Sequence, residues 1–434
     1  MTADDIVFNY NRIYGEFTWA PDRAPVEDMY AADKHTFVVE MPTFNVNWEQ
    51  YISNMWSTQL YAPEVVEAGA SDWNNLVGTG PFLVKEYIPG SAMHYERNPI
   101  FYDTTVINGV EYELPFVDEL VFVQMPDEST RIAALRTGTI DYMGGIMSPL
   151  PLRFEDTLRQ TSPDLIIEPY LATEAQWIGF PYSSEVPVEF VMDRDVRRAL
   201  MVGLDLEAIA KATMGQAEVH SWPVSRLDPD TFTPLDELPE SSQLLYGYDP
   251  ELAQQMLADA GYPDGFTLVM PVDGSDVLRM DMTSMIKDQW SKMGVEVDMK
   301  VMESGALNTF LGEYPADEPP PWHGFIERIV NVLGIAAMTS LGVHQAQIPV
   351  WYADRYEEAI RTVDSDARNA IIRELILREI DDALYIPIGT PYELLAKWPW
   401  VKNWYGEYID TGRGMSHITA RMWIDRGLKE ELGY

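Results

Sequence analysis

Cysteine is absent from the 434 residues of the chain, and basic residues are scarce. Without cysteine, the chain cannot form a disulfide, a thiolate zinc site or an iron–sulfur cluster, and it has no cysteine nucleophile. Lysine and arginine number 30 against 69 aspartate and glutamate residues, so the formal net charge is −39. Nucleic acids and anionic membranes are bound by clustered basic side chains, so we expect neither to be a partner.

Long apolar runs are also missing. The longest, Ile329–Met338, contains Asn331 and Gly334 and is far shorter than the roughly 20 residues that a helix needs to cross a bilayer. The residues after Met1 have neither the basic nor the apolar stretch of a signal peptide. With 46% apolar and 12% aromatic residues, however, the chain can build sizeable cores, and its length favours two or three lobes.

Sequence patterns of common enzyme classes are not found. The histidines, at positions 35, 94, 220, 323, 344 and 417, lack the paired spacing of metal ligands. Residues 78–81 lack the third glycine of a dinucleotide fingerprint and the lysine of a phosphate loop, so they are interpreted as a turn. We therefore expect no metal and no cofactor, and a binding protein is favoured over an enzyme. Paired carboxylates are abundant, which leaves a secreted glycan hydrolase as the alternative.

Residues 249–302 predict one α/β unit. Asp249 and Pro250 begin a helix that Gly261 ends. A strand over 266–270 and an amphipathic helix over 278–293 follow. Residues 295–301 then alternate between apolar and charged side chains, as a half-buried strand does. Strand, helix and strand of these lengths are typical of a crossover between parallel strands.

Weaker patterns predict further elements. Helices are expected over 2–14, 127–137 and 366–382, and tryptophans 48 and 56 belong to a stretch with helical spacing. Strands are expected over 35–41 and 117–123, and a hairpin over 82–96 around Pro89-Gly90. The segment 313–349 shows no clear period.

Several ordered motifs carry a resemblance. Residues 248–266 read Tyr-Asp-Pro-Glu-Leu-Ala-Gln-Gln-Met-Leu-Ala-Asp-Ala-Gly-Tyr-Pro-Asp-Gly-Phe, which resembles a segment of the family 5 solute-binding proteins. These are the extracellular peptide-, oligopeptide- and nickel-binding components of ABC importers. Asp193–Leu200 resembles the family's D-x-x-V-R-x-A-L, residues 78–82 its G-T-G-P-Y/F, and residues 289–295 its Q-W-x-K-I-G-V. Further matches lie at 97–99 and 126–141.

The resemblance implies an α/β fold of the two-lobed periplasmic-binding type (type II) with an extra subdomain. It implies a remnant of that subdomain over 1–76, lobe I over 77–172 plus 390–434, and lobe II over 173–389. The beginning of this chain resembles an internal stretch of the family, so lobe I is expected to lack its amino-terminal portion. A truncated fragment without function is therefore a further alternative.

The resemblance implies that a peptide-like or other small organic solute is trapped between the lobes by hinge closure and delivered to the permease subunits. It implies a monomer that works outside the cytoplasmic membrane, in the periplasm or as a cell-surface lipoprotein. Residues just after the chain crossings face the solute, and the tryptophan of a later segment matches a family cleft tryptophan. The predicted ligand-binding residues are Glu174, Gln176, Trp177, Trp322, Thr390 and Tyr392.

The sequence departs from the family at one position. Oligopeptide binders usually follow the cleft tryptophan with an aspartate that pairs with the free amino group of the peptide. Residues 322–328 here read Trp-His-Gly-Phe-Ile-Glu-Arg, with Glu327 as a possible substitute. Nickel chelates, oligosaccharides, opines and other organic solutes therefore stay open, although no histidine pattern favours nickel.

Overall fold

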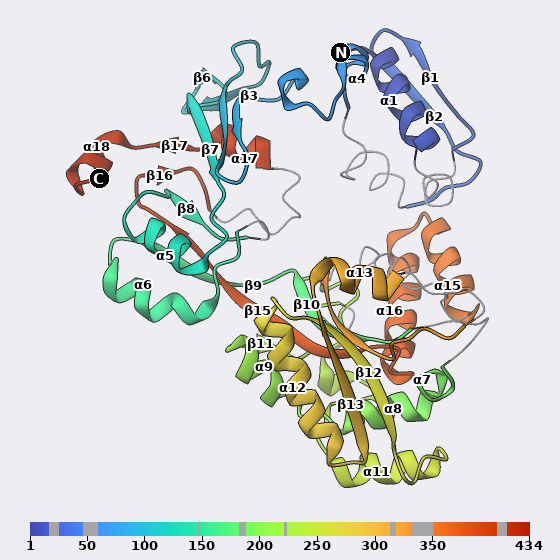
Figure 1. The fold of residues 1–434 in the computed structure, drawn as a ribbon. Coiled ribbons are helices and arrows are strands. Elements are labelled where there is room, and N and C mark those ends of the chain that lie inside the picture. The colour runs from blue at the N-terminus through green and yellow to red at the C-terminus, as the bar shows by residue number, and fades with distance from the viewer. Residues whose placement is uncertain are drawn as a thin grey trace. The chain divides into compact units, whose positions relative to one another are not determined.

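The chain divides into two compact units. The computed structural model describes residues 1–16, 26–46, 60–145, 148–181, 188–220, 224–312, 318–330, 350–405 and 415–434. Unit 1 comprises Met1–Pro169 and Leu394–Tyr434, and unit 2 comprises Tyr170–Glu393 (Figure 1). The two-lobed α/β fold is thus confirmed. The divisions fall within a few residues of the expected lobe boundaries, 172/173 and 389/390, while the separate subdomain over 1–76 stays a prediction.

Two strands carry the chain from one unit to the other. The first passage occurs within β9 (Ile166–Leu171), and the return passage occurs within β15 (Ile386–Lys397). β9 pairs with β15, so the two passages are held together by backbone hydrogen bonds. Side chains near these strands are therefore the natural place to look for a functional site.

Unit 1 begins with a small packed module. Helix α1 (Ala3–Glu16) rests on the hairpin of β1 (Asp28–Asp33) and β2 (Thr36–Glu40). The rings of Tyr10 and Phe37 stack there with centroids 5.3 Å apart. Asn9 connects the helix to the chain just before α4 (Pro63–Ala68), because its side-chain amide donates to the Tyr61 carbonyl at 2.7 Å. The helix and strand predicted over 2–14 and 35–41 are confirmed, whereas tryptophans 48 and 56 lie outside the described residues.

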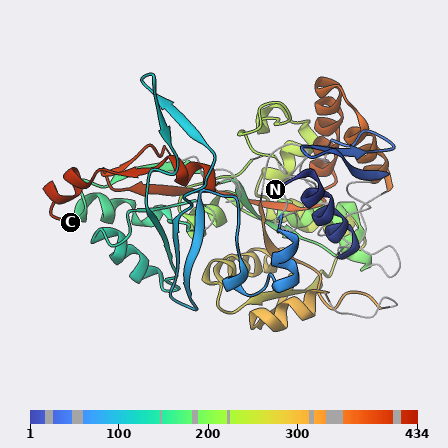
Figure 2. The same cartoon turned by 90° about the horizontal axis from the view of Figure 1, so that it is seen from above.

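Strands β3 (Phe82–Ile88), β4 (Ala92–Arg97) and β7 (Glu119–Val123) form an antiparallel sheet in unit 1. Strands β5 (Thr104–Ile107) and β6 (Val110–Glu113) form a hairpin that extends away from it (Figure 2). The predicted hairpin is β3–β4, and its turn contains Gly90 with φ of 72°. Helix α5 begins after Asp127, whose carboxylate accepts from Thr130 N at 2.7 Å. These sequence predictions are confirmed.

The described helices of unit 1 are α1 (Ala3–Glu16), α4 (Pro63–Ala68), α5 (Glu128–Arg136), α6 (Glu155–Thr161), α17 (Met415–Arg421) and α18 (Arg426–Glu431), with short 3-10 turns at Trp73–Asn75 and Leu152–Phe154. Its described strands, besides its parts of β9 and β15, are β1 (Asp28–Asp33), β2 (Thr36–Glu40), β3 (Phe82–Ile88), β4 (Ala92–Arg97), β5 (Thr104–Ile107), β6 (Val110–Glu113), β7 (Glu119–Val123), β8 (Tyr142–Met143), β16 (Val401–Lys402) and β17 (Trp423–Ile424).

The described helices of unit 2 are α7 (Glu189–Met192), α8 (Arg194–Val202), α9 (Leu206–Met214), α10 (Glu240–Gln243), α11 (Pro250–Asp259), α12 (Val277–Ser291), α13 (Ser304–Gly312), α15 (Val350–Arg361) and α16 (Ser365–Asp381), with 3-10 turns at Leu235–Glu237 and Leu244–Tyr246. Its described strands, besides its parts of β9 and β15, are β10 (Glu174–Gly179), β11 (Ala217–Glu218), β12 (Phe266–Asp273), β13 (Val295–Met302) and β14 (Phe325–Val330).

The predicted α/β unit is present in unit 2. Strands β12 and β13 are parallel, in register from Phe266 opposite Val295 to Asp273 opposite Met302. Helix α12 connects them and packs on both, as Figure 1 shows. Its Trp290 is fully buried and donates from Nε1 to the Leu200 carbonyl of α8 at 2.8 Å. The alternation and the helical period of the sequence thus placed each element correctly.

A second sheet of unit 2 runs in the order β11–β15–β10–β14 and has a core on each side. Ile178 of β10 joins a core built largely by α8, α9, α11, α12, β12 and β13. Ala175 and Trp177, which alternate with Ile178, join a core formed with α15 and α16. We call these the α12 face and the α16 face of the sheet.

Candidate functional site

The predicted residues on β10 divide between the two faces of the sheet. Successive side chains of a strand point to opposite faces. Glu174 and Gln176 therefore lie on the α12 face with Ile178, whereas Trp177 lies on the α16 face. The sequence interpretation placed all three residues in one site, but a single face of β10 cannot present them together.

Trp177 lies inside the core of unit 2. Its side chain is 1% exposed, and its ring stands edge-on to Tyr385 with centroids 4.2 Å apart. Gly179, two residues along the same face, leaves room for it: a Cβ at this glycine would be 3.1 Å from the indole and 3.6 Å from the ring of Phe325. These are the contacts of a packing residue, and the ligand-binding role of Trp177 stays a prediction.

Trp322 belongs to the same aromatic group. Phe325 lies opposite Gly179 in the β10–β14 register, and Trp322 packs edge-on against Phe325 with centroids 5.1 Å apart. The next residue, His323, is held by the backbone, because its Nδ1 accepts from Val269 N at 3.0 Å. Burial lowers the pKa of His323, which favours the neutral imidazole. The segment that carries Trp322 is thus fixed to β12.

Gln176 is buried on the α12 face. Its side chain is 5% exposed, and among the described residues its Oε1 has no hydrogen-bond partner. Gly389 lies opposite it on β15, and a Cβ there would be 3.2 Å from the Glu218 carbonyl and 3.5 Å from Met214. Glu174 is buried to a similar extent. Both residues are enclosed by protein, so their ligand-binding roles stay predictions.

Thr390 and Tyr392 lie on the α16 face. Gly389 faces the same side as Gln176, so Thr390, one residue further along β15, points to the other side. Thr390 is fully buried, and a hydrogen bond of 2.7 Å joins its Oγ1 to His220 Nε2. Since Thr390 lies opposite Glu218 in the register, Tyr392 and Glu218 share its face.

Tyr392 is the centre of a polar group that solvent can reach. Its hydroxyl donates to Glu218 at 2.5 Å and accepts from Arg226 at 3.1 Å. The guanidinium of Arg226 also pairs with Glu218 through Nε at 2.9 Å. The side chain of Arg226 is half exposed, and that of Glu218 is 27% exposed. The hydrogen bonds from Arg226 to Glu218 and Tyr392 raise the pKa of the guanidinium.

The structure places Trp177, Thr390 and Tyr392 on the α16 face and Glu174 and Gln176 on the α12 face, while Trp322 packs against Phe325. The ligand-binding roles of all six residues stay predictions. Sequence reasoning missed Glu218, Arg226 and His220. His220 was considered a lone histidine, and no local pattern connects it with Thr390, which is 170 residues away.

Two features of the described residues concern metal binding and membrane insertion. No group of three or more histidine, aspartate or glutamate side chains in the described ranges is placed to hold a metal ion. Among the helices that the structure describes, none combines the length and the apolar character needed to span a bilayer.

A two-unit α/β architecture with two paired connecting strands defines a class of protein, the two-lobed binding proteins. Comparison with known sequences makes the assignment specific. Residues 1–322 match the bacterial extracellular solute-binding proteins, family 5 (middle part), and the chain belongs to this family. The resemblance found in the motifs is thus confirmed.

Three individual proteins resemble the chain at low sequence identity. The oligopeptide-binding protein AppA of Bacillus subtilis is 23% identical over 346 residues, which are 74% of this chain and 58% of AppA. DppA from Helicobacter pylori, solved with the peptide STSA, has a TM-score of 0.72 at 18% identity and matches over 98% of this chain and 82% of that one. AgaA from A. tumefaciens R10, solved with agropinic acid, has a TM-score of 0.75 at 15% identity, over 98% and 83%.

These comparisons establish the fold and the family of the chain. The solved structures, all below a quarter in identity, establish the fold. The chain spans less than two thirds of the length of the first curated relatives. The family consists of binding proteins rather than enzymes, and its members are extracellular by description. Nothing in the comparisons favours a glycan hydrolase.

Proposed function

We propose that this protein is the solute-binding component of an ABC importer, which captures a peptide-like solute and delivers it to the permease subunits outside the cytoplasmic membrane. The family match over residues 1–322 carries the proposal. Capture by closure of two lobes needs two compact units joined by few strands, and β9 and β15 are such connections. The function is binding alone, without bond chemistry.

Tyr392, Glu218 and Arg226 are proposed to meet the solute in unit 2. Together they offer a carboxylate, a guanidinium and a hydroxyl on one half-exposed surface. An ammonium group pairs with the carboxylate, and a carboxylate group pairs with the guanidinium. A short peptide carries both groups at its ends, so the chemistry of this surface supports a zwitterionic solute.

Oligopeptide binders of the family usually have an aspartate that pairs with the free amino group of the peptide. The residue at the matching position of this chain therefore indicates which solute it can bind. Glu327 lies in β14 opposite Trp177, but its side chain is outside the described part of the structure. Glu218 is a second carboxylate that can receive an ammonium group. The relatives differ in what they hold, since DppA was solved with a tetrapeptide and AgaA with agropinic acid. The free amino group of the solute is therefore the feature to test.

Native mass spectrometry of the chain purified without added ligand tests the proposal first. A folded charge distribution with an adduct released on activation is expected, and the adduct mass gives the solute class. Calorimetric titration with dialanine, trialanine and their N-acetylated forms follows. We expect the free peptides to bind and acetylation to weaken binding by tenfold or more, since an ammonium–carboxylate contact is lost, worth about 1.5–3 kcal/mol.

Two results would contradict the proposal. One is a folded chain that carries no adduct and binds no member of the panel. The other is binding without closure, which small-angle scattering detects, because a ligand that contacts both lobes favours the closed state and lowers the radius of gyration. A ligand that binds with unchanged scattering would leave a binding protein that does not work by hinge closure.

A further inference from the structure

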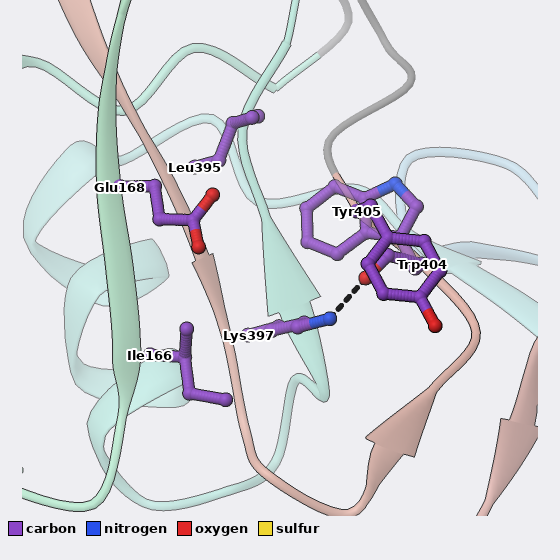
Figure 3. A pocket seen from close by; sticks show the side chains of 6 residues that line it. All are labelled: Ile166, Glu168, Leu395, Lys397, Trp404 and Tyr405. Atoms are coloured by element: carbon purple, nitrogen blue, oxygen red, sulfur yellow. Dashed lines mark hydrogen bonds between the residues drawn. The ribbon is translucent and has the colours of Figure 1, made fainter.

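Unit 1 contains a small pocket between the connecting strands and the two aromatic residues that follow β16. Its volume is about 60 Å³. Six residues line it: Ile166 and Glu168 of β9, Leu395 and Lys397 of β15, and Trp404 and Tyr405. Figure 3 shows the side chains of Glu168 and Lys397 extending toward the side on which the two rings lie. All six residues belong to unit 1.

The alternation of the strands explains why these side chains meet. Ile167 of β9 is buried, so its neighbours Ile166 and Glu168 point to the other face. On β15, Leu395 and Lys397 alternate in the same way with the fully buried Ala396. The pocket thus has an apolar part, formed by Ile166 and Leu395, and a charged part, formed by Glu168 and Lys397.

Lys397 is held at the wall of the pocket. Its ammonium donates a hydrogen bond to the Trp404 carbonyl, shown dashed in Figure 3. The nitrogen also lies 5.7 Å from the ring centroid of Trp404 and 5.2 Å from that of Tyr405. These contacts fix a positive charge at a defined place, because cation–π attraction and a hydrogen bond act on one group.

Glu168 brings the opposite charge. Its side chain is exposed on β9 and points into the same pocket (Figure 3). Within the described residues, the carboxylate of Glu168 makes no hydrogen bond or ion pair, whereas Lys397 is anchored by its neighbours. An anion alone would be repelled by Glu168, and a cation alone by Lys397. A molecule with one charge of each sign gains an attractive contact with each of the two side chains.

We propose that this pocket binds a small zwitterion, a free α-amino acid with a short side chain. The ammonium group pairs with Glu168, the carboxylate pairs with Lys397, and the side chain rests against Ile166 and Leu395. The volume suits this size, since 60 Å³ holds about four to six water-sized spheres at ~10–15 Å³ each. Alanine has a comparable number of non-hydrogen atoms, whereas a tripeptide is too large.

The pocket lies next to both passages of the chain between the units. Ile166 and Glu168 lie shortly before the first passage between the units, and Leu395 and Lys397 lie shortly after the return. A bound amino acid therefore joins β9 to β15 beside both passages. The site is distinct from the solute-binding surface proposed above, which lies in unit 2. Its occupancy does not depend on that surface.

Saturation-transfer NMR and calorimetry with L-alanine test the proposal on the full chain. Propionate and ethylammonium, which carry one charge each, serve as comparison ligands. We expect L-alanine to bind and the single-charge ligands to bind at least tenfold more weakly. Glu168→Gln and Lys397→Met should each weaken L-alanine by about tenfold or more, since each removes one charge-assisted contact.

Matched variants identify the site. Glu113→Gln on exposed β6 and Lys34→Met near the β1–β2 turn make the same chemical changes elsewhere in unit 1 and should leave L-alanine binding unchanged. Glu168→Gln keeps the shape of an exposed side chain, so it tests the pocket even if Lys397→Met fails to fold. Tyr392→Phe separates the two sites: L-alanine bound in unit 1 keeps its affinity in this variant.

Several results would overturn the proposal. One is a wild-type chain that does not bind L-alanine, and another is binding of propionate or ethylammonium as tight as that of L-alanine. Equal binding to wild type and Glu168→Gln would place the ligand elsewhere. A loss in Tyr392→Phe with no loss in Glu168→Gln would assign alanine to the unit 2 surface, which would leave the proposed function intact and remove the unit 1 site.

Discussion

His220 Nε2 and Thr390 Oγ1 lie 2.7 Å apart inside unit 2, where both side chains are buried. This contact joins β15 to the segment that follows β11, close to the return of the chain to unit 1. A buried hydrogen bond contributes most when its loss leaves one partner in an apolar place. The pair therefore fixes the position of β15, and with it that of Tyr392 two residues later.

Thr390→Val should lower the free energy of unfolding by about 1–3 kcal/mol, because the imidazole loses this partner while the shape of the side chain is kept. Thr390→Ser retains the hydroxyl and should recover most of the loss. Urea denaturation followed by tryptophan fluorescence measures both. A Thr390→Val variant as stable as wild type would show that this hydrogen bond does not contribute to the stability.

Tyr392→Phe should weaken solute binding by about tenfold and leave the stability within about 0.5 kcal/mol of wild type. The change removes the hydroxyl that Glu218 and Arg226 share and keeps the ring. Calorimetry with the solute found by native mass spectrometry gives the affinity. Tyr112→Phe, on the exposed β6 strand, is the matched control. Unchanged affinity in Tyr392→Phe would remove this residue from the solute-binding surface.

Gly179→Ala should destabilise unit 2 by about 1–3 kcal/mol through overpacking. The new methyl would lie 3.1 Å from the ring of Trp177, and that indole has no free space because it is 1% exposed. Near-ultraviolet circular dichroism should change as the indole shifts. Gly80→Ala is the control, since its Cβ would meet nothing within 4 Å. A fully stable Gly179→Ala would show that Trp177 can move within its core.

The local elements were predictable, because their signals lie within a few residues of one another. Alternation over 295–301 and the helix signals at Asp249 and Gly261 describe one strand and one helix each, and the structure has both. The parallel pairing of β12 with β13 follows from the length of the connecting helix. For such elements, local side-chain patterning and tertiary packing agree.

The site was only partly predictable, because it depends on which face of the sheet each side chain occupies and on contacts between residues far apart in the sequence. The family resemblance led to the residues after each chain passage, yet it did not separate Gln176 from Trp177, which the strand directs to opposite faces. Nothing in the sequence links His220 to Thr390. The register of β15 shifts near Gly389, so simple alternation along this strand would not have placed Tyr392 on its observed face.

The sequence did contain a signal for one buried acid. In α16 the apolar positions include Ile372, Leu375 and Ile376, and Glu379 falls on the same stripe, seven residues after the first and four after the second. The structure buries Glu379 to 2% exposure beside Tyr352, whose hydroxyl donates a hydrogen bond to it. Its Oε2 has no hydrogen-bond partner within the described residues.

Burial raises the pKa of Glu379 well above its ordinary value of 4.5, and the hydrogen bond from Tyr352 only partly opposes this. The unfolded chain ionises the carboxyl at the ordinary value, whereas the folded protein keeps it protonated to a higher pH. The contribution of the buried neutral carboxyl to the free energy of unfolding is thus fully present below about pH 4.5. It is lost as the pH rises toward the folded pKa, by up to ~1.4 kcal/mol per pH unit.

Glu379→Gln should therefore stabilise the protein at neutral pH, because the amide keeps an acceptor for Tyr352 and does not ionise in the unfolded chain. The gain relative to wild type should vanish near pH 4 and grow as the pH rises above about 4.5. Urea denaturation at several pH values measures this difference. Glu374→Gln, an exposed position of the same helix paired with Arg355, should change stability by less than about 1 kcal/mol at any pH. A gain for Glu379→Gln that does not depend on pH would show that the carboxyl is ionised in the folded protein.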